Sequence, residues 1–212
     1  MKKLIFLLAI AGVSATTAIG QDKSQGIITY EVTVNVHASM KPDQLKYKDL
    51  VPEKVVTKEV LSFNGNKSLL VRKDQEEVTS DEGAKIKIAA NEGQVAVYTE
   101  GNQAWSLKDQ DGKKTLVIQE TKNSFENGTQ TKEIFGFKCR EVLFKSKNMG
   151  VLTLWVTDDL PLTAGPMGLF VDKGLVLCIE SKKLSAVVTN VNYTPVNIQE
   201  VTKPADVQIV KK

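Results

Sequence analysis

Histidine, long apolar runs and an excess of one charge sign are all missing or scarce in this sequence of 212 residues. Its single histidine, His37, is too few for a metal site of three histidines and makes a hydrolase triad a poor interpretation. No apolar stretch reaches the roughly 20 residues that a membrane-spanning helix needs. The formal net charge is only +3, and Lys2 and Lys3 supply two of those charges, so no broad basic surface for nucleic acid is expected.

The first residues predict a cleavable export signal. Two lysines precede an apolar run over residues 4–13, and small residues end the segment. A basic start, a short apolar core and small residues before the cleavage point are the three parts of such a signal. We therefore expect a signal peptide over residues 1–20, cleavage between Gly20 and Gln21, and a single domain over residues 21–212 that is periplasmic or secreted.

Only two cysteines are present, Cys139 and Cys178. An even number in an oxidising compartment permits a disulfide, and both residues lie in β-rich runs, so we predict a bond between two strands of one sheet. The alternative is two unrelated thiols that pack as small hydrophobic side chains. Neither cysteine has a CxxC neighbour or a nearby histidine, which makes a zinc or redox site a poor interpretation.

Period-two alternation is the main structural signal. Over residues 28–36, apolar and polar side chains alternate, which predicts a strand with one buried face. The Asn64-Gly65 pair predicts a tight hairpin between strands at 55–63 and 67–72. Similar but shorter signals predict further strands at residues 85–89, 94–99, 103–107, 113–120, 137–144, 151–157, 175–180, 184–194 and 207–210.

The remaining segments predict loops. Residues 40–51 indicate a loop or a short helix, and residues 74–83 and 121–131 are polar and predict loops. Two prolines and a glycine over 158–166 predict an ordered, irregular crossover, and residues 170–180 predict a hairpin. The fold class that follows is mostly β: a strongly curved antiparallel sheet, forming an open or partial barrel, with little helix.

Few residues suggest a site. Trp105 and Trp155 are the only tryptophans, and on strands they either belong to the core or line a concave face that binds a ligand. His37 continues the polar face of the first strand, which indicates an exposed strand residue. Asp158 and Asp159 could hold a cation, but adjacent carboxylates on an extended chain point apart and are common in surface turns. We expect no metal and no cofactor.

Several segments resemble the GLPGLI family of exported proteins from Bacteroidota. Residues 134–139 read IFGFKC, similar to an opening I-x-G-(aromatic)-K-C, and residues 154–161 read LWVTDDLP, followed by Gly165-Pro166. The opening residues 26–30 are also similar. The name-giving hexapeptide is only half matched, because residues 171–176 read VDKGLV and a lysine takes the place of the proline.

The resemblance implies a shape and no activity. It suggests an architecture similar to periplasmic lipoprotein carriers, in which a curved sheet covers an apolar cavity, and it supplies no catalytic residues. We therefore expect a non-enzymatic envelope protein that binds a lipophilic or peptide-like ligand on its sheet. The alternative is a structural or regulatory module that docks another envelope protein, and an enzyme ranks third because no reactive constellation is visible.

Overall fold

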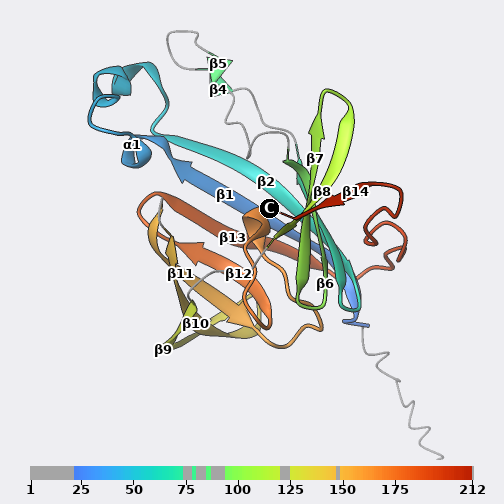
Figure 1. Cartoon of the computed structure of the whole chain (residues 1–212). Helices are drawn as coiled ribbons and strands as arrows, with labels where there is room; N and C mark the ends of the chain where they lie inside the picture. Colours follow the sequence, from blue (N-terminus) through green and yellow to red (C-terminus); the bar gives the residue numbers. More distant parts are fainter. Residues whose placement is uncertain are drawn as a thin grey trace, which may run out of the picture.

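The computed structural model describes residues 22–73, 78–79, 85–86, 94–119, 125–146 and 149–211. One curved sheet of 12 strands dominates it, in the order β14-β8-β7-β6-β3-β2-β1-β13-β12-β11-β10-β9 (Figure 1). The strands are β1 (Gln25–Asn35), β2 (Lys54–Asn64), β3 (Lys67–Lys73), β6 (Gln94–Glu100), β7 (Gln103–Gln110), β8 (Lys113–Gln119), β9 (Phe125–Ile134), β10 (Phe137–Ser146), β11 (Gly150–Thr157), β12 (Leu175–Glu180), β13 (Leu184–Asn192) and β14 (Gln208–Val210).

The predicted fold class is confirmed. The strand order is linear and its two ends, β14 and β9, do not pair, so the sheet is open. All neighbours are antiparallel except β14 and β8. The described helices are short: α1 (Val36–Ser39), η1 (Leu45–Leu50) and η2 (Pro166–Gly168). None of the helices in the described ranges is long and apolar enough to cross a membrane.

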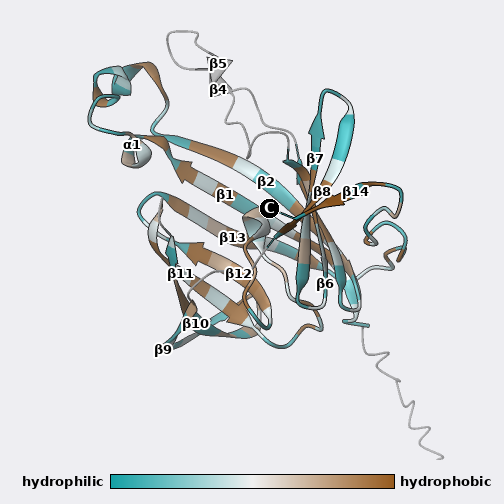
Figure 2. Cartoon of the chain, viewed as in Figure 1, coloured by the Kyte–Doolittle hydropathy of each residue, from teal (hydrophilic) through white to brown (hydrophobic). Residues whose placement is uncertain are grey.

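Two meanders make up the sheet. Strands β1, β2, β3, β6, β7 and β8 form one, with β14 added at its edge, and β9 to β13 form the other. In each meander, strands that follow one another along the chain are adjacent in the sheet. The two meet where β1 pairs with β13. Apolar and polar residues alternate along β1 and β2 (Figure 2), and Gly65 turns between β2 and β3 with φ 60°, as the hairpin signal predicted.

The crossover between β11 and β12 covers the apolar part of the inner face of the sheet. The inner face is defined here as the face that carries Ile28, Tyr30 and Leu61, which are fully buried. Five apolar residues of the crossover (158–174) are buried in the same hydrophobic cluster: Leu160, Leu162, Ala164, Phe170 and Val171. The predicted irregular, ordered crossover is thus confirmed, and its order comes from the side chains that it buries.

A second, smaller hydrophobic cluster lies on the opposite face. It contains Trp105, Leu107 and Leu116, with Val207 from the C-terminal segment packed against it. Ala104, next to Trp105 on β7, belongs to the inner cluster instead. Because successive side chains of a strand point to opposite faces, this half of the sheet is covered on both sides.

Three sequence predictions are wrong. The predicted loop at 121–131 contains most of strand β9, and residues 121–124 lie outside the described residues. Residues 170–171 are irregular, so β12 has no hairpin partner there. The loop predicted at 74–83 contains strand β4 (Val78–Thr79), which pairs with β5 (Lys85–Ile86). Strand β5 agrees with the strand predicted at 85–89, and the other residues of these two segments lie outside the described residues.

Sequence analysis did not predict strand β9 because it is a polar edge strand. It pairs with β10 alone, and a bulge interrupts the pairing between Arg140 and Val142. The Glu141 carboxylate accepts hydrogen bonds from the backbone N–H groups of Thr129 and Gln130 at the bulge. An edge strand with a bulge and exposed polar side chains needs no apolar alternation, which is the signal that sequence analysis relies on.

Candidate functional site

Five hydrogen-bonding side chains line the inner face of the first meander. We call them the inner polar belt: Glu59 on β2, Arg72 on β3, Gln94 on β6, Ser106 on β7 and Gln119 on β8. Register places Glu59 opposite Arg72, so both side chains emerge on the same face. Ser106 connects the two glutamines, because its Oγ donates to Gln94 Oε1 at 3.2 Å and accepts from Gln119 Nε2 at 2.5 Å.

The crossover lies against both parts of the belt: the pair of Glu59 and Arg72, and Ser106 with its two glutamines. Glu59 is only 3 % exposed, and its Oε2 accepts a hydrogen bond from the backbone N–H of Met167 at 2.6 Å. The next residue, Gly168, has φ 69°, and a methyl group added there would lie 3.4 Å from Gln119 Nε2. Helix η2 therefore passes between Glu59 and Gln119.

One hydrogen-bond donor of the belt has no acceptor among the described residues. Arg72 Nη2 lies 3.3 Å from Glu59 Oε1, but the buried Nε of the same guanidinium has no hydrogen-bond partner among the described residues. A buried donor without an acceptor costs about 1–3 kcal/mol. The belt thus contains a polar group that no described residue of the chain satisfies.

The belt has the chemistry of binding. Amide, hydroxyl, guanidinium and carboxylate groups donate and accept in several directions, which suits a ligand rich in hydroxyl and amide groups. Ser106 contacts two glutamines, and neither is a base that could activate its hydroxyl. Within the described ranges, no three His, Cys, Asp or Glu side chains gather so that they could hold a metal ion.

A concavity separate from the belt, the rim cleft, has a volume of about 360 Å³. Four separate segments supply its lining: Lys23, Phe135, Gly136, Phe137, Asp159, Val191 and Tyr193. Burial, and then the nearby Asp159 charge, raise the pKa of Tyr193. Aromatic and aliphatic side chains thus form most of the lining, and Lys23 and Asp159 add one charge of each sign.

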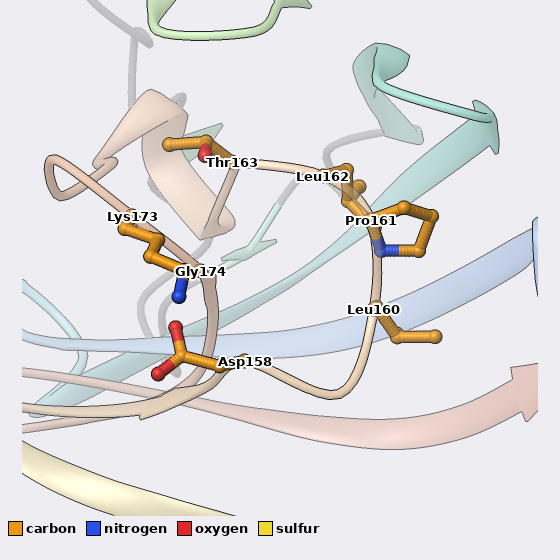
Figure 3. A pocket seen from close by; sticks show the side chains of 7 residues that line it. All are labelled: Asp158, Leu160, Pro161, Leu162, Thr163, Lys173 and Gly174. Atoms are coloured by element: carbon orange, nitrogen blue, oxygen red, sulfur yellow. The ribbon is translucent and has the colours of Figure 1, made fainter.

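Another concavity, of about 260 Å³, lies along the crossover, and Figure 3 shows the residues that line it. The Asp158 carboxylate points toward the adjacent Gly174 on one side (Figure 3), and Leu160 to Thr163 form the other side. Arg140 ties the two ends of the crossover together: its Nε lies 3.5 Å from Asp158 Oδ2, and its Nη2 donates to the Lys173 carbonyl at 2.7 Å. Because Asp158 and Asp159 line different concavities, they do not form a joint cation site.

The two tryptophans do not come together. Each is 5 % exposed, and they belong to hydrophobic clusters on different halves of the sheet. A lysine ammonium covers each ring, Lys203 at 4.9 Å from Trp105 and Lys132 at 4.1 Å from Trp155. Trp155 Nε1 also donates to Glu180 Oε2 at 2.9 Å. The geometry favours the core interpretation for Trp105 and Trp155 over a ligand-binding one.

The two cysteines are both free and buried, so the disulfide predicted between Cys139 and Cys178 is not formed in this structure. Cys139 lies on β10 opposite Thr157, whereas Cys178 lies on β12 opposite Trp155. Strand β11 thus separates them. Neighbouring strands are about 4.8 Å apart, so two strand spacings exceed the 7 Å or so that a disulfide allows between Cα atoms.

Thiol labelling tests this arrangement. Burial raises the pKa of both thiols to about 11, from an ordinary value near 9. We therefore expect very slow alkylation of the native protein at pH 8, where about one thiol in a thousand is ionised, and faster reaction as the pH approaches 11. In denaturant without reductant, intact-mass measurement should find two labels per chain. A chain that takes up no label under those conditions would restore the disulfide.

His37 is neither on a strand nor fully exposed. It lies in α1, partly buried, with its Nε2 3.0 Å from the Val51 carbonyl oxygen. The exposed-strand interpretation is therefore wrong in its details. This hydrogen bond helps to close the segment between β1 and β2, and no acidic or nucleophilic partner of His37 is seen among the described residues.

Sequence analysis missed the inner polar belt, although one signal was present. In β2 the buried positions are Val55, Thr57, Glu59, Leu61 and Phe63. Glu59 shares the parity of the apolar residues, and a carboxylate at a core position is rarely fully buried unless it is paired. An acidic residue in phase with the core is thus a sign of a buried contact.

Comparisons with known proteins give a consistent answer. The family model described as N-glycanase peptide, N-terminal domain (PNGase F-II) matches residues 55–211. A structure of PNGF-II in space group C2 shares the fold, with TM-score 0.57 and 15% identity over 89% of this chain and 31% of that chain. The same protein in space group P21 gives TM-score 0.54 and 17% identity over 89% and 32%.

Two further findings set the scope of these matches. The chain spans about a third of the length of the PNGF-II chains that it resembles. No curated protein matches it in sequence. The matched family model is not that of the GLPGLI family, whose resemblance to residues 134–180 stays a prediction.

Proposed function

Because the chain belongs to the family of N-glycanase peptide N-terminal domains, we propose that it is a recognition domain that binds N-glycosylated peptides at the inner polar belt. In this proposal it has no catalytic activity of its own and works outside the cytoplasm. Two features support it: the family description names an N-terminal domain, and the PNGF-II chains are about three times as long as the matched region.

The observation that carries the proposal is the belt with its unpaired donor. A glycopeptide offers hydroxyl, amide and carbonyl groups, and the belt offers complementary donors and acceptors. Arg72 Nε has no acceptor among the described residues, and Gln94 and Gln119 are only partly buried, so their amides can exchange partners. Together they provide several hydrogen-bonding groups, on strands β3, β6 and β8.

The arrangement speaks against a lipophilic ligand inside the sheet. A lipid carrier needs a continuous apolar cavity of several hundred Å³. Here the apolar part of the inner face is occupied by the chain's own crossover, whose Leu162 and Phe170 are buried. The peptide-like half of the sequence-based expectation fits the polar part of the inner face better.

Calorimetric titration tests the proposal with an N-glycosylated peptide and the same peptide without its glycan. Gln119→Ala removes one amide of the belt, and we expect it to weaken glycopeptide binding about 2- to 10-fold, the value of one or two neutral hydrogen bonds. The control is Gln103→Ala, an exposed glutamine at the start of β7, which should bind as the unmodified chain does. If neither peptide binds, or if Gln119→Ala binds as tightly as Gln103→Ala, the proposal fails.

A further inference from the structure

Phe135 occupies a backbone position that does not suit it. The turn between β9 and β10 consists of Phe135 at φ 53° and Gly136 at φ 78°. A two-residue hairpin turn of this kind favours Asn, Asp or Gly, because an L-residue with a bulky side chain is strained at positive φ. The same turn between β7 and β8 has the favoured residues, Asp111 at φ 53° and Gly112 at φ 82°.

Burial does not compensate for the strain at Phe135. Its side chain is 53 % exposed, although phenylalanine is among the residues most often buried. Phe135 lines the rim cleft, as does Phe137 at the start of β10. A strained and exposed aromatic residue at the edge of a concavity is an observed outlier of the kind that points to function.

The rest of the rim cleft indicates the chemistry of a ligand. Aromatic faces attract organic cations, and a carboxylate beside them strengthens that attraction. The cleft combines the aromatic residues Phe135, Phe137 and Tyr193 with Asp159. Lys23, which supplies the opposite charge, forms no ion pair with any described residue, and neither does Asp159.

We propose that the rim cleft binds a small zwitterion, in which an organic ammonium group is joined by a few bonds to a phosphate or a carboxylate. The ammonium lies against the aromatic side chains and Asp159, and the anionic group lies at Lys23. A neutral sugar fits less well, because the polar side chains of the lining are two full charges and one phenol. This site is separate from the inner polar belt, and its proposal stands independently of glycopeptide binding.

The test uses phosphorylethanolamine and phosphorylcholine as calorimetric probes. Phe135→Gly removes the ring and gives the strained position the residue that it favours. We expect this variant to keep or raise the midpoint of urea unfolding while it loses at least fivefold in affinity for both probes. Asp159→Asn should weaken the binding of both probes as well. Asp111→Gly is the matched control: it makes the same backbone change in the equivalent turn and should leave probe binding unchanged.

Several results would overturn the proposal. The proposal is wrong if the unmodified chain binds neither probe. It is also wrong if Phe135→Gly binds the probes as tightly as Asp111→Gly does. A fall in the unfolding midpoint of Phe135→Gly would assign the ring to packing instead. Preferential binding of a neutral saccharide at the same residues would also overturn it. Binding of the soluble probes supports the proposal, and co-sedimentation with phosphatidylethanolamine vesicles that Phe135→Gly abolishes would support it with a lipid headgroup as the source.

Discussion

Glu59→Ala should lower the free energy of unfolding by about 3–5 kcal/mol, the usual cost of removing one member of a buried ion pair. The carboxylate is 3 % exposed and has two partners, the Arg72 guanidinium and the Met167 backbone N–H. Without it, the arginine loses its counter-charge and the backbone donor loses its acceptor. The crossover would also lose its polar attachment to β2.

Urea denaturation followed by circular dichroism measures the effect. Glu133→Ala, an exposed glutamate on β9, is the control and should change stability by about 0.5 kcal/mol or less. The double variant Glu59→Leu with Arg72→Met should lose less than Glu59→Ala alone, because it removes both charges together. A Glu59→Ala variant as stable as Glu133→Ala would show that the attachment of the crossover does not depend on Glu59.

Gly174→Ala should cost about 3 kcal/mol or more, well above the usual penalty for alanine at positive φ. Gly174 has φ 97°, and an added Cβ would lie 2.6 Å from the Thr157 carbonyl oxygen and 2.7 Å from Asp158 Oδ1. The first of these atoms belongs to the backbone of the sheet and cannot move aside without disturbing β11. The clash therefore adds to the strain of the dihedral angle.

Gly112→Ala separates the two contributions. Gly112 has φ 82°, but nothing lies within 4 Å of an added Cβ, so only dihedral strain remains and a loss of about 1 kcal/mol is expected. The difference between the two variants in the same denaturation experiment measures the clash. Equal losses would mean that the chain around Thr157 yields to the added methyl group.

The strand pattern could be predicted from the sequence because it depends on local alternation. β1 and β2 pack one face on a core, which imposes period two over their whole length. The Asn64-Gly65 turn is equally local. β9 could not be found in this way, because an edge strand with polar side chains on both faces carries no such periodicity.

The candidate sites were beyond sequence analysis for a different reason. The rim cleft collects residues from four segments, and the inner polar belt spans five strands. Glu59 and Gln119 become neighbours of one helix only after the crossover folds back over the sheet. For the cysteines, sequence analysis predicted a contact instead of missing one. An even number suggested a bond, but the strand register keeps Cys139 and Cys178 apart.

The junction of the two meanders has a consequence for how the protein is made. β1 is the first strand in the sequence, and its neighbours are β2, the next strand, and β13, which ends at Asn192. During synthesis, β1 therefore gains β2 as a partner early and can pair with β13 only after residues 184–192 have emerged. Throughout that interval, one side of β1 exposes backbone hydrogen-bonding groups that any other extended chain could pair with. A chaperone that shields unpaired strand edges would therefore act on β1 during that interval.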